Sequence, residues 1–158
     1  MVFAKHIINR FSFVNEAAGG KLLLGETKLQ KLLFICDGYL LAAGSNLIKE
    51  CAKAWNYGPV YPRIHTWLKK ETDAFTKKYE GIPEELSEKE EITELVDAVL
   101  NTYGRWSAND LSNWSHRPGS PWETALEKGR GVMNSPIDKN DMKAYFQGLV
   151  RGNQQNNS

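Results

Sequence analysis

The sequence predicts a mainly α-helical protein, a single compact domain of about seven helices with one small strand or hairpin element. Three observations support this fold class. Apolar residues recur with helical spacing along most of the chain, helix-capping patterns precede several of these segments, and only one short stretch is punctuated like a strand. The chain has 158 residues, of which 41% are hydrophobic, and this is enough for one sizeable core.

Two helices are predicted before the first extended segment. Apolar residues with helical spacing run from residue 2 to about residue 18, where Gly19 and Gly20 end the helix. The second helix is expected to start at Thr27, because Thr27 and Gln30 match a capping box in which each side chain bonds to the other's backbone amide. It is apolar around most of its circumference, which is typical of a helix packed on several sides. Its predicted inward stripe consists of Leu29, Leu32, Leu33, Cys36 and Leu40.

The segment from residue 47 to residue 55 is predicted to be extended. Gly44 precedes it, and Gly58 and Pro59 follow it, so it is bounded by residues that interrupt regular structure. Pro62 is expected to start the next helix, because the first amide of a helix has no intrahelical partner and proline loses nothing there.

The remaining helices are predicted from their starting residues. Side chains that can accept a hydrogen bond from a backbone amide precede four further helical segments, at Ser87, Ser107, Ser120 and Asp138. The helix after Asp138 is expected to lose its apolar face near the end of the chain. The domain is therefore predicted to span residues 1–151, and residues 152–158 are predicted to be a disordered tail.

Charge and hydropathy argue against several classes of partner. Twenty basic and nineteen acidic residues give a formal charge of +1, which disfavours nucleic acid as a partner. The segment 108–129 has the length of a helix-turn-helix, but Glu123 and Glu127 would face the phosphates. No stretch approaches the roughly 18 apolar residues of a membrane span, so no membrane partner and a cytoplasmic location are expected. Cys36 and Cys51 have apolar neighbours and are expected to be reduced and buried.

The sequence carries no recognisable catalytic or cofactor-binding motif. The three histidines and two cysteines lack the spacing with which a short loop grips a metal ion. The stretch GKLLLGET at 20–27 is close to a phosphate-binding loop, but Glu26 stands where that loop needs lysine and would repel phosphate. Neither a GxSxG elbow nor a recognised triad order is present. The protein is therefore predicted to be no enzyme, with no catalytic residue, no metal and no cofactor.

Residues 54–62, AWNYGPVYP, form the most unusual segment. No uninterrupted helix or strand can hold so many prolines and aromatic rings, so the segment must fix one particular geometry. Two interpretations remain open. Trp55, Tyr57 and Trp122 can be buried rings that stabilise the fold, each worth roughly 3 to 5 kcal/mol. Alternatively, part of the segment is an exposed surface that binds a partner, since Tyr and Trp are favoured interface anchors.

Three stretches together resemble the signatures of the Panacea domain family. They are TKLQKLLFICDGYLLAAG at 27–44, AWNYGPVYPRI at 54–64 and LSNWSHRPGSPW at 111–122. The resemblance implies a small helical protein of bacterial or phage origin that acts as an antitoxin and neutralises its toxin by direct binding. It implies a cognate protein toxin as the partner, encoded next to the antitoxin gene. One branch of the family acts instead as an adaptor that delivers its toxin to a protease, such as a Clp-type machine. A stand-alone prophage protein that interacts with another partner is a further alternative.

The resemblance and the residue types together give a list of candidate site residues. Lys28 and Lys31 are expected to project side by side into solvent and to form a polar rim with Arg63 and His65. Reversing the charge of both lysines is accordingly expected to weaken toxin capture without changing the melting temperature. The candidate structural residues are Gly58, Pro59, Pro62, Pro121 and Trp122. The candidate partner-binding residues are Lys28, Lys31, Trp55, Tyr57, Tyr61, Arg63, His65, Asn113, Ser115 and His116.

Overall fold

The structure is a computed structural model that describes residues 1–87 and 89–156, without the side chains of residues 85, 87 and 154–156. It is mainly helical with one small antiparallel sheet, which confirms the predicted fold class. The elements in chain order are α1 (Val2–Ala17), α2 (Glu26–Ala42), β1 (Lys53–Trp55), β2 (Gly58–Val60), α3 (Pro62–Lys70), α4 (Glu84–Ser87), α5 (Glu90–Tyr103), α6 (Ala108–Ser115), α7 (Pro121–Lys128), β3 (Ser135–Pro136) and α8 (Lys139–Asn156).

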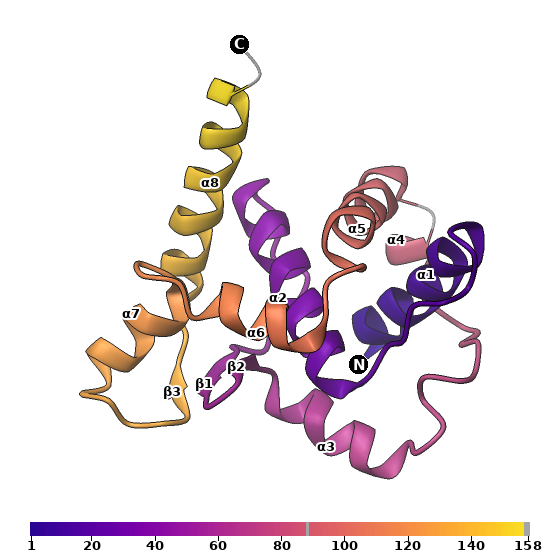
Figure 1. The fold of residues 1–158 in the computed structure, drawn as a ribbon, viewed down its shortest axis with the longest axis horizontal. Coiled ribbons are helices and arrows are strands. Elements are labelled where there is room, and N and C mark those ends of the chain that lie inside the picture. Colours follow the sequence, from indigo (N-terminus) through magenta and orange to yellow (C-terminus); the bar gives the residue numbers. More distant parts are fainter. Residues whose placement is uncertain (88, 157–158) are drawn as a thin grey trace.

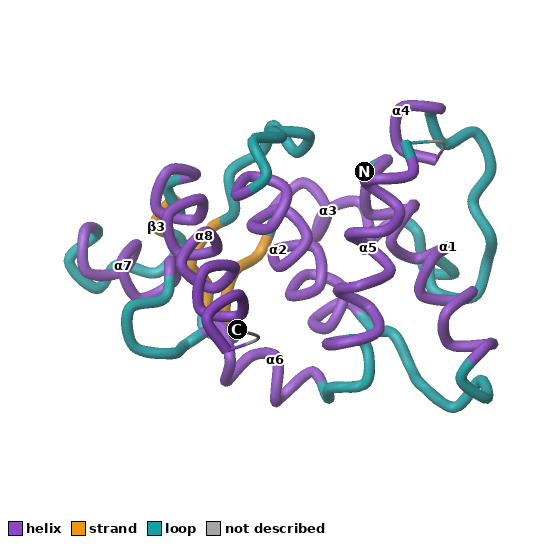
Figure 2. Tube along the Cα trace, turned by 90° about the horizontal axis from the view of Figure 1, so that it is seen from above, coloured by secondary structure: helices purple, strands orange, loops and turns teal. Residues whose placement is uncertain are grey.

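Helix α2 is the centre of the domain. It contacts α1 and α5 on one side and α6 and α8 on the other, and Figures 1 and 2 show it between these groups. Every residue of the predicted inward stripe is buried, and so are most of the other side chains of this helix. The expectation of a central helix packed on several sides is confirmed.

The start of α2 differs from the prediction. The helix begins at Glu26 with Gly25 as its N-cap, so the capping box expected at Thr27 is wrong. Gln30 is buried, and its side-chain amide bonds to Tyr61 instead: Gln30 Oε1 accepts from Tyr61 N at 2.9 Å, and Gln30 Nε2 donates to Tyr61 O at 3.3 Å. Gln30 therefore bonds to a residue distant in the sequence and not to the backbone of Thr27. These bonds tie the end of the hairpin to α2.

The sheet has the strand order β2, β1, β3, and both pairings are antiparallel. The predicted extended segment is a strand only at its end, from Lys53 to Trp55, and the Gly58 and Pro59 that were expected to terminate it form part of β2. The prediction that Cys51 is buried is wrong, whereas Cys36 is buried as expected. Ala52 and Ala54 face the core, so the alternation of an extended chain directs Cys51 to solvent.

Most of the predicted helix starts are confirmed. Ser107 Oγ accepts from Asp110 N, Ser120 Oγ accepts from Glu123 N, and Pro62 stands in the first turn of α3. Asp138 Oδ1 accepts from the amides of Asn140 and Asp141 at the start of α8. Helix α5 begins at Glu90 with Lys89 as its N-cap, which is later than the start predicted from a cap at Ser87. The side chain of Ser87 lies outside the described residues. Helix α8 continues beyond residue 151 to residue 156.

A buried polar contact joins α2, α3 and α8. Asp37 Oδ2 accepts a hydrogen bond from Tyr61 Oη at 2.6 Å and lies 3.4 Å from Lys139 Nζ. Lys139 also donates to the carbonyl of Ile48. Burial raises the pKa of the Asp37 carboxyl above its ordinary value, although the bond from Tyr61 and the charge of Lys139 act in the opposite direction.

The raised pKa predicts a specific pH dependence of stability. Between the ordinary pKa of aspartate, about 3.9, and the higher folded-state pKa, the folded protein binds more protons at Asp37 than the unfolded chain does. The contribution of this group to the free energy of unfolding therefore falls as the pH rises through that window. Asp37→Asn removes the contribution, so the variant is expected to gain stability relative to the wild type from about pH 4 towards neutrality. Urea unfolding of both proteins across this range tests it, and parallel pH profiles would contradict it.

Candidate functional site

The β1–β2 hairpin is held from three sides. Trp122 Nε1 of α7 donates to Trp55 O at 2.7 Å, and Ser112 Oγ of α6 donates to Tyr57 O at 2.7 Å. From the turn before β3, the backbone N–H of Asn134 donates to Ala54 O at 2.7 Å. The hairpin is therefore a rigid platform, because its turn and strand carbonyls are bonded to separate elements.

Gly58 allows the hairpin to lie close to α2 and α6. Its φ is +109°, a conformation that residues with a side chain rarely adopt. A Cβ atom at this position would lie 2.3 Å from Ser115 Oγ and 2.7 Å from Lys31 Cε. The glycine is needed for both the backbone conformation and the close approach.

A pocket of about 600 Å³ lies beside this platform. Its walls come from the first turns of α2, from the hairpin, from α3 and from the turn before β3. The residues that matter for its chemistry are Glu26, Lys31, Trp55, Tyr57, His65 and Met133. These elements are far apart in the sequence, and the antiparallel sheet brings the hairpin and the turn before β3 together.

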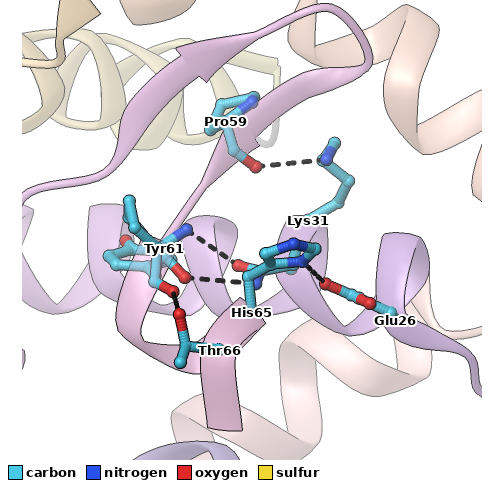
Figure 3. A network of polar contacts seen from close by, with 8 residues as sticks. Glu26, Lys31, Pro59, Tyr61, His65 and Thr66 are labelled. Carbon is cyan, nitrogen blue, oxygen red and sulfur yellow. Dashed lines mark hydrogen bonds and ion pairs between the residues drawn. The ribbon is translucent and has the colours of Figure 1, made fainter. Parts of the chain in front are cut away.

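Lys31 is the buried charged group of the pocket. Its side chain is only 1% exposed, and Nζ donates to Pro59 O at 3.1 Å. Burial lowers the pKa of Lys31 to about 8, and the neighbouring carboxylate of Glu26 raises it to a smaller extent. Figure 3 shows the ammonium reaching from α2 to the hairpin, with Glu26 and His65 nearby.

Glu26, His65 and Trp55 form a second connected group. The carboxylate of Glu26 contacts His65 Nδ1 (Figure 3), and the His65 ring packs edge-on against Trp55 with the ring centroids 5.1 Å apart. Trp55 Nε1 in turn donates to Asn134 Oδ1 at 2.9 Å. Each ring is therefore fixed in orientation before any partner arrives.

Two large side chains at the pocket remain exposed. Tyr57 is 73% exposed and Met133 is 44% exposed, although both are apolar enough to be favoured in a core. Tyr is enriched among residues that dominate binding energy, and Met adapts its shape to a partner. Exposed apolar groups beside a fixed aromatic pocket are typical of a protein-interaction surface.

Two of the predicted site residues are buried, contrary to expectation. The expectation that Lys28 and Lys31 project into solvent is wrong, because they are 7% and 1% exposed. Lys28 Nζ lies over the ring of Phe11, 5.2 Å from its centroid, and burial lowers the pKa of Lys28. Replacing both lysines with glutamate would therefore bury two carboxylates and destabilise the fold. The substitution would not act on a solvated rim.

The other candidates are either buried or line a different depression of the surface. Tyr61 and Ser115 are buried and do not reach the surface. His116 is half-buried, with its ring nitrogens against the carbonyl oxygens of Ser112 and Asn56, and its ring packs on that of Trp122. Arg63 and Asn113 are exposed but line other depressions of the surface. The structure thus brings Lys31, Trp55, Tyr57 and His65 together.

The candidate structural residues occupy fixed positions. Gly58 and Pro59 form β2 with Val60, Pro62 starts α3, and Pro121 starts α7. Trp122 is half-buried and connects α7 to the hairpin through the bond to Trp55 O.

Sequence reasoning missed Glu26, Met133 and Asn134 as site residues. Glu26 was considered only as a residue that disqualifies a phosphate loop. Met133 follows Val132 in the glycine-rich stretch GRGVMN, and two adjacent apolar residues in such a turn are a usable signal of an exposed contact. Asn134 has a φ of +68°, which no local pattern indicated.

The arrangement favours binding over chemistry. Among the side chains that the structure describes, no three His, Cys, Asp or Glu residues are grouped so that they could hold a metal ion. In the same part of the chain, no helix is both long and apolar enough to cross a bilayer. The pocket combines aromatic walls, one buried cation and an exposed Tyr–Met pair, which are features of a surface that recognises another protein.

The fold and the site together define a small helical protein with a pre-formed, aromatic-walled pocket. Residues 29–123 match the family described as "Antitoxin SocA-like, Panacea domain", and the chain belongs to this family. It is also similar to the protein "Antitoxin SocA" of Caulobacter vibrioides (strain NA1000 / CB15N), with 28% identity over 129 residues, which cover 75% of this chain and 68% of that protein. No solved structure gave a significant match.

Family membership supports an antitoxin-type role and suggests a non-enzymatic, regulatory one. The matched segment contains Lys31, the whole hairpin and His65, so most of the pocket lies within the family domain. Glu26 and Met133 lie outside the matched segment, one on each side of it.

Proposed function

We propose that the protein is an antitoxin-type binding protein that neutralises a protein toxin by direct contact, with the pocket beside the hairpin as its docking surface. The observation that carries this proposal is the placement of exposed Tyr57 and Met133 at a pocket whose other walls are fixed by hydrogen bonds. A pre-organised surface loses little conformational entropy on binding, so its contacts contribute fully to affinity.

The combined variant Tyr57→Ala and Met133→Ala tests the surface. We expect it to fold normally, because both side chains are exposed, and to bind the toxin more than about 30-fold more weakly, as expected for loss of a central anchor. The protein products of the open reading frames that flank the gene are co-expressed with each antitoxin variant. Co-purification and rescue of growth are then measured.

A matched control is available on the same chain. Phe13 and Leu23 are also exposed and apolar, but they do not line the pocket. The variant Phe13→Ala with Leu23→Ala is expected to capture the toxin as well as the wild type does. Equal capture by the Tyr57 and Met133 variant would exclude this pocket as the docking surface.

The lifetime of the toxin separates direct neutralisation from delivery to a protease. Sequestration leaves the toxin intact, so its half-life during co-expression should stay the same or increase. A shortened half-life that depends on a host protease would overturn neutralisation by contact alone and favour an adaptor role.

A further inference from the structure

The Lys31 ammonium has more hydrogen-bonding capacity than the structure uses. A lysine ammonium carries three N–H donors. One of them goes to Pro59 O, and no second acceptor for Lys31 is found in the part of the chain that the structure describes. Because the side chain is 1% exposed, water replaces these bonds poorly.

The position of the ammonium is constrained from two sides. The hairpin covers it, since a Cβ on Gly58 would lie 2.7 Å from Lys31 Cε. The bond to Pro59 O fixes the end of the side chain, so the free donors cannot turn away to bulk solvent. Lys31 therefore contributes a fixed positive charge to the lining of an aromatic-walled pocket.

We propose that this pocket receives an acidic side chain of the partner, an aspartate or glutamate, whose carboxylate accepts hydrogen bonds from Lys31 Nζ. The proposal rests on the proposed function and specifies the chemistry that the toxin must present. Hydrogen bonds between two charged groups are shorter and roughly twice as strong as neutral ones, and they gain further when solvent is excluded. Tyr57 and Met133 would cover the inserted side chain and exclude water from the pair.

The carboxylate and the imidazole that also line the pocket are compatible with this ligand. Glu26 and His65 contact each other, and their side chains are 37% and 25% exposed, so they lie closer to solvent than Lys31 does. Of these charged groups, Lys31 is therefore the one most shielded from solvent.

The lowered pKa of Lys31 is consistent with the same ligand. Burial keeps the pKa of Lys31 at about 8, so a fraction of the molecules loses this charge slightly above neutral pH. A bound carboxylate stabilises the charged form and raises that pKa. The interaction should accordingly weaken as the pH increases beyond about 8.

The first test uses the unmodified protein and a pair of small probes. N-acetyl-glutamate N-methylamide carries the carboxylate, and N-acetyl-glutamine N-methylamide is its neutral isostere. We expect the glutamate probe to bind at least about tenfold more tightly and to shift the ¹³Cε resonance of Lys31 and its titration midpoint upward in pH. Equal binding of both probes, or no response of Lys31 at the solubility limit of the glutamate probe, would overturn the proposal.

The second test uses Lys31→Met, which keeps an unbranched side chain one atom shorter than lysine and removes the donors. The variant should lose the preference for the glutamate probe while retaining the wild-type fold, checked by circular dichroism. If a flanking toxin is captured by the wild type, Lys31→Met should reduce capture at least about tenfold. Replacing one particular acidic residue of the toxin with its amide should give a similar loss, and the two losses should not add.

The outcomes distinguish this inference from the proposed function. Toxin capture that needs Tyr57 and Met133 but is unchanged in Lys31→Met would overturn the carboxylate site and leave the antitoxin role intact. Selective binding of the glutamate probe without capture of any flanking protein would support the carboxylate site and count against that toxin as the partner.

Discussion

Tyr61→Ala is expected to lower the free energy of unfolding by about 3 to 5 kcal/mol, the range found when large buried rings are truncated. Tyr61 is the N-cap of α3, its side chain is fully buried, and its hydroxyl donates to Asp37 of α2. The substitution would leave a cavity and would also remove the hydrogen bond to Asp37 Oδ2, so that among the described residues this buried carboxylate keeps only Lys139 as a partner.

Tyr57→Ala provides the matched control four residues away. The ring of Tyr57 is mostly exposed, so its loss should change the free energy of unfolding by less than about 0.5 kcal/mol. Urea denaturation of the two variants measures the difference directly. A loss below about 1 kcal/mol for Tyr61→Ala would mean that the site collapses around the deleted ring and that the Tyr61 side chain adds little to the stability of the core.

Gly38→Ala is expected to destabilise the protein by about 3 kcal/mol, at the upper end of the usual cost of overpacking. A Cβ on Gly38 would lie 2.2 Å from two ring carbons of Phe146, which is fully buried where α8 crosses α2. An aromatic ring in a packed core cannot move aside as a flexible side chain can. The steric clash is therefore relieved only if α8 shifts.

Gly148→Ala tests whether packing is the cause. Gly148 lies in α8, and nothing lies within 4 Å of a Cβ built there. Alanine is favoured over glycine in a helix by about 1 kcal/mol, so this variant should be more stable than the wild type. The two glycine substitutions are therefore expected to change the free energy of unfolding in opposite directions. If both destabilise the protein, the α2–α8 pair tolerates substitution poorly in general.

Features set by short-range interactions were predictable from the sequence. The caps at Ser107 and Ser120 and the start of α3 at Pro62 depend on residues within one helical turn, and all three were predicted correctly. The cap at Thr27 failed because Gln30 finds its partner in Tyr61, 31 positions away. A local pattern cannot reveal that a distant backbone group is a better partner.

The environment of Lys31 could not be predicted for a related reason. Helical periodicity shows which residues share a face, but not how many faces other elements cover. Helix α2 is surrounded, so a lysine assigned to the outer face lies beneath the hairpin. Similarly, Met133 reaches the pocket only because β3 pairs with β1, and this pairing of two short strands leaves almost no trace in the sequence.

The turn before β3 separates the anchoring of the site from its recognition. Asn134 supplies the bonds to Ala54 and Trp55, whereas the adjacent side chain of Met133 faces outward and supports none of the core. Position 133 can therefore vary in size, shape and charge while the scaffold keeps its architecture. Under the proposed docking, such a position lets a lineage change the partners that it accepts through single substitutions, and it gives protein engineers a place to begin a library aimed at a new target.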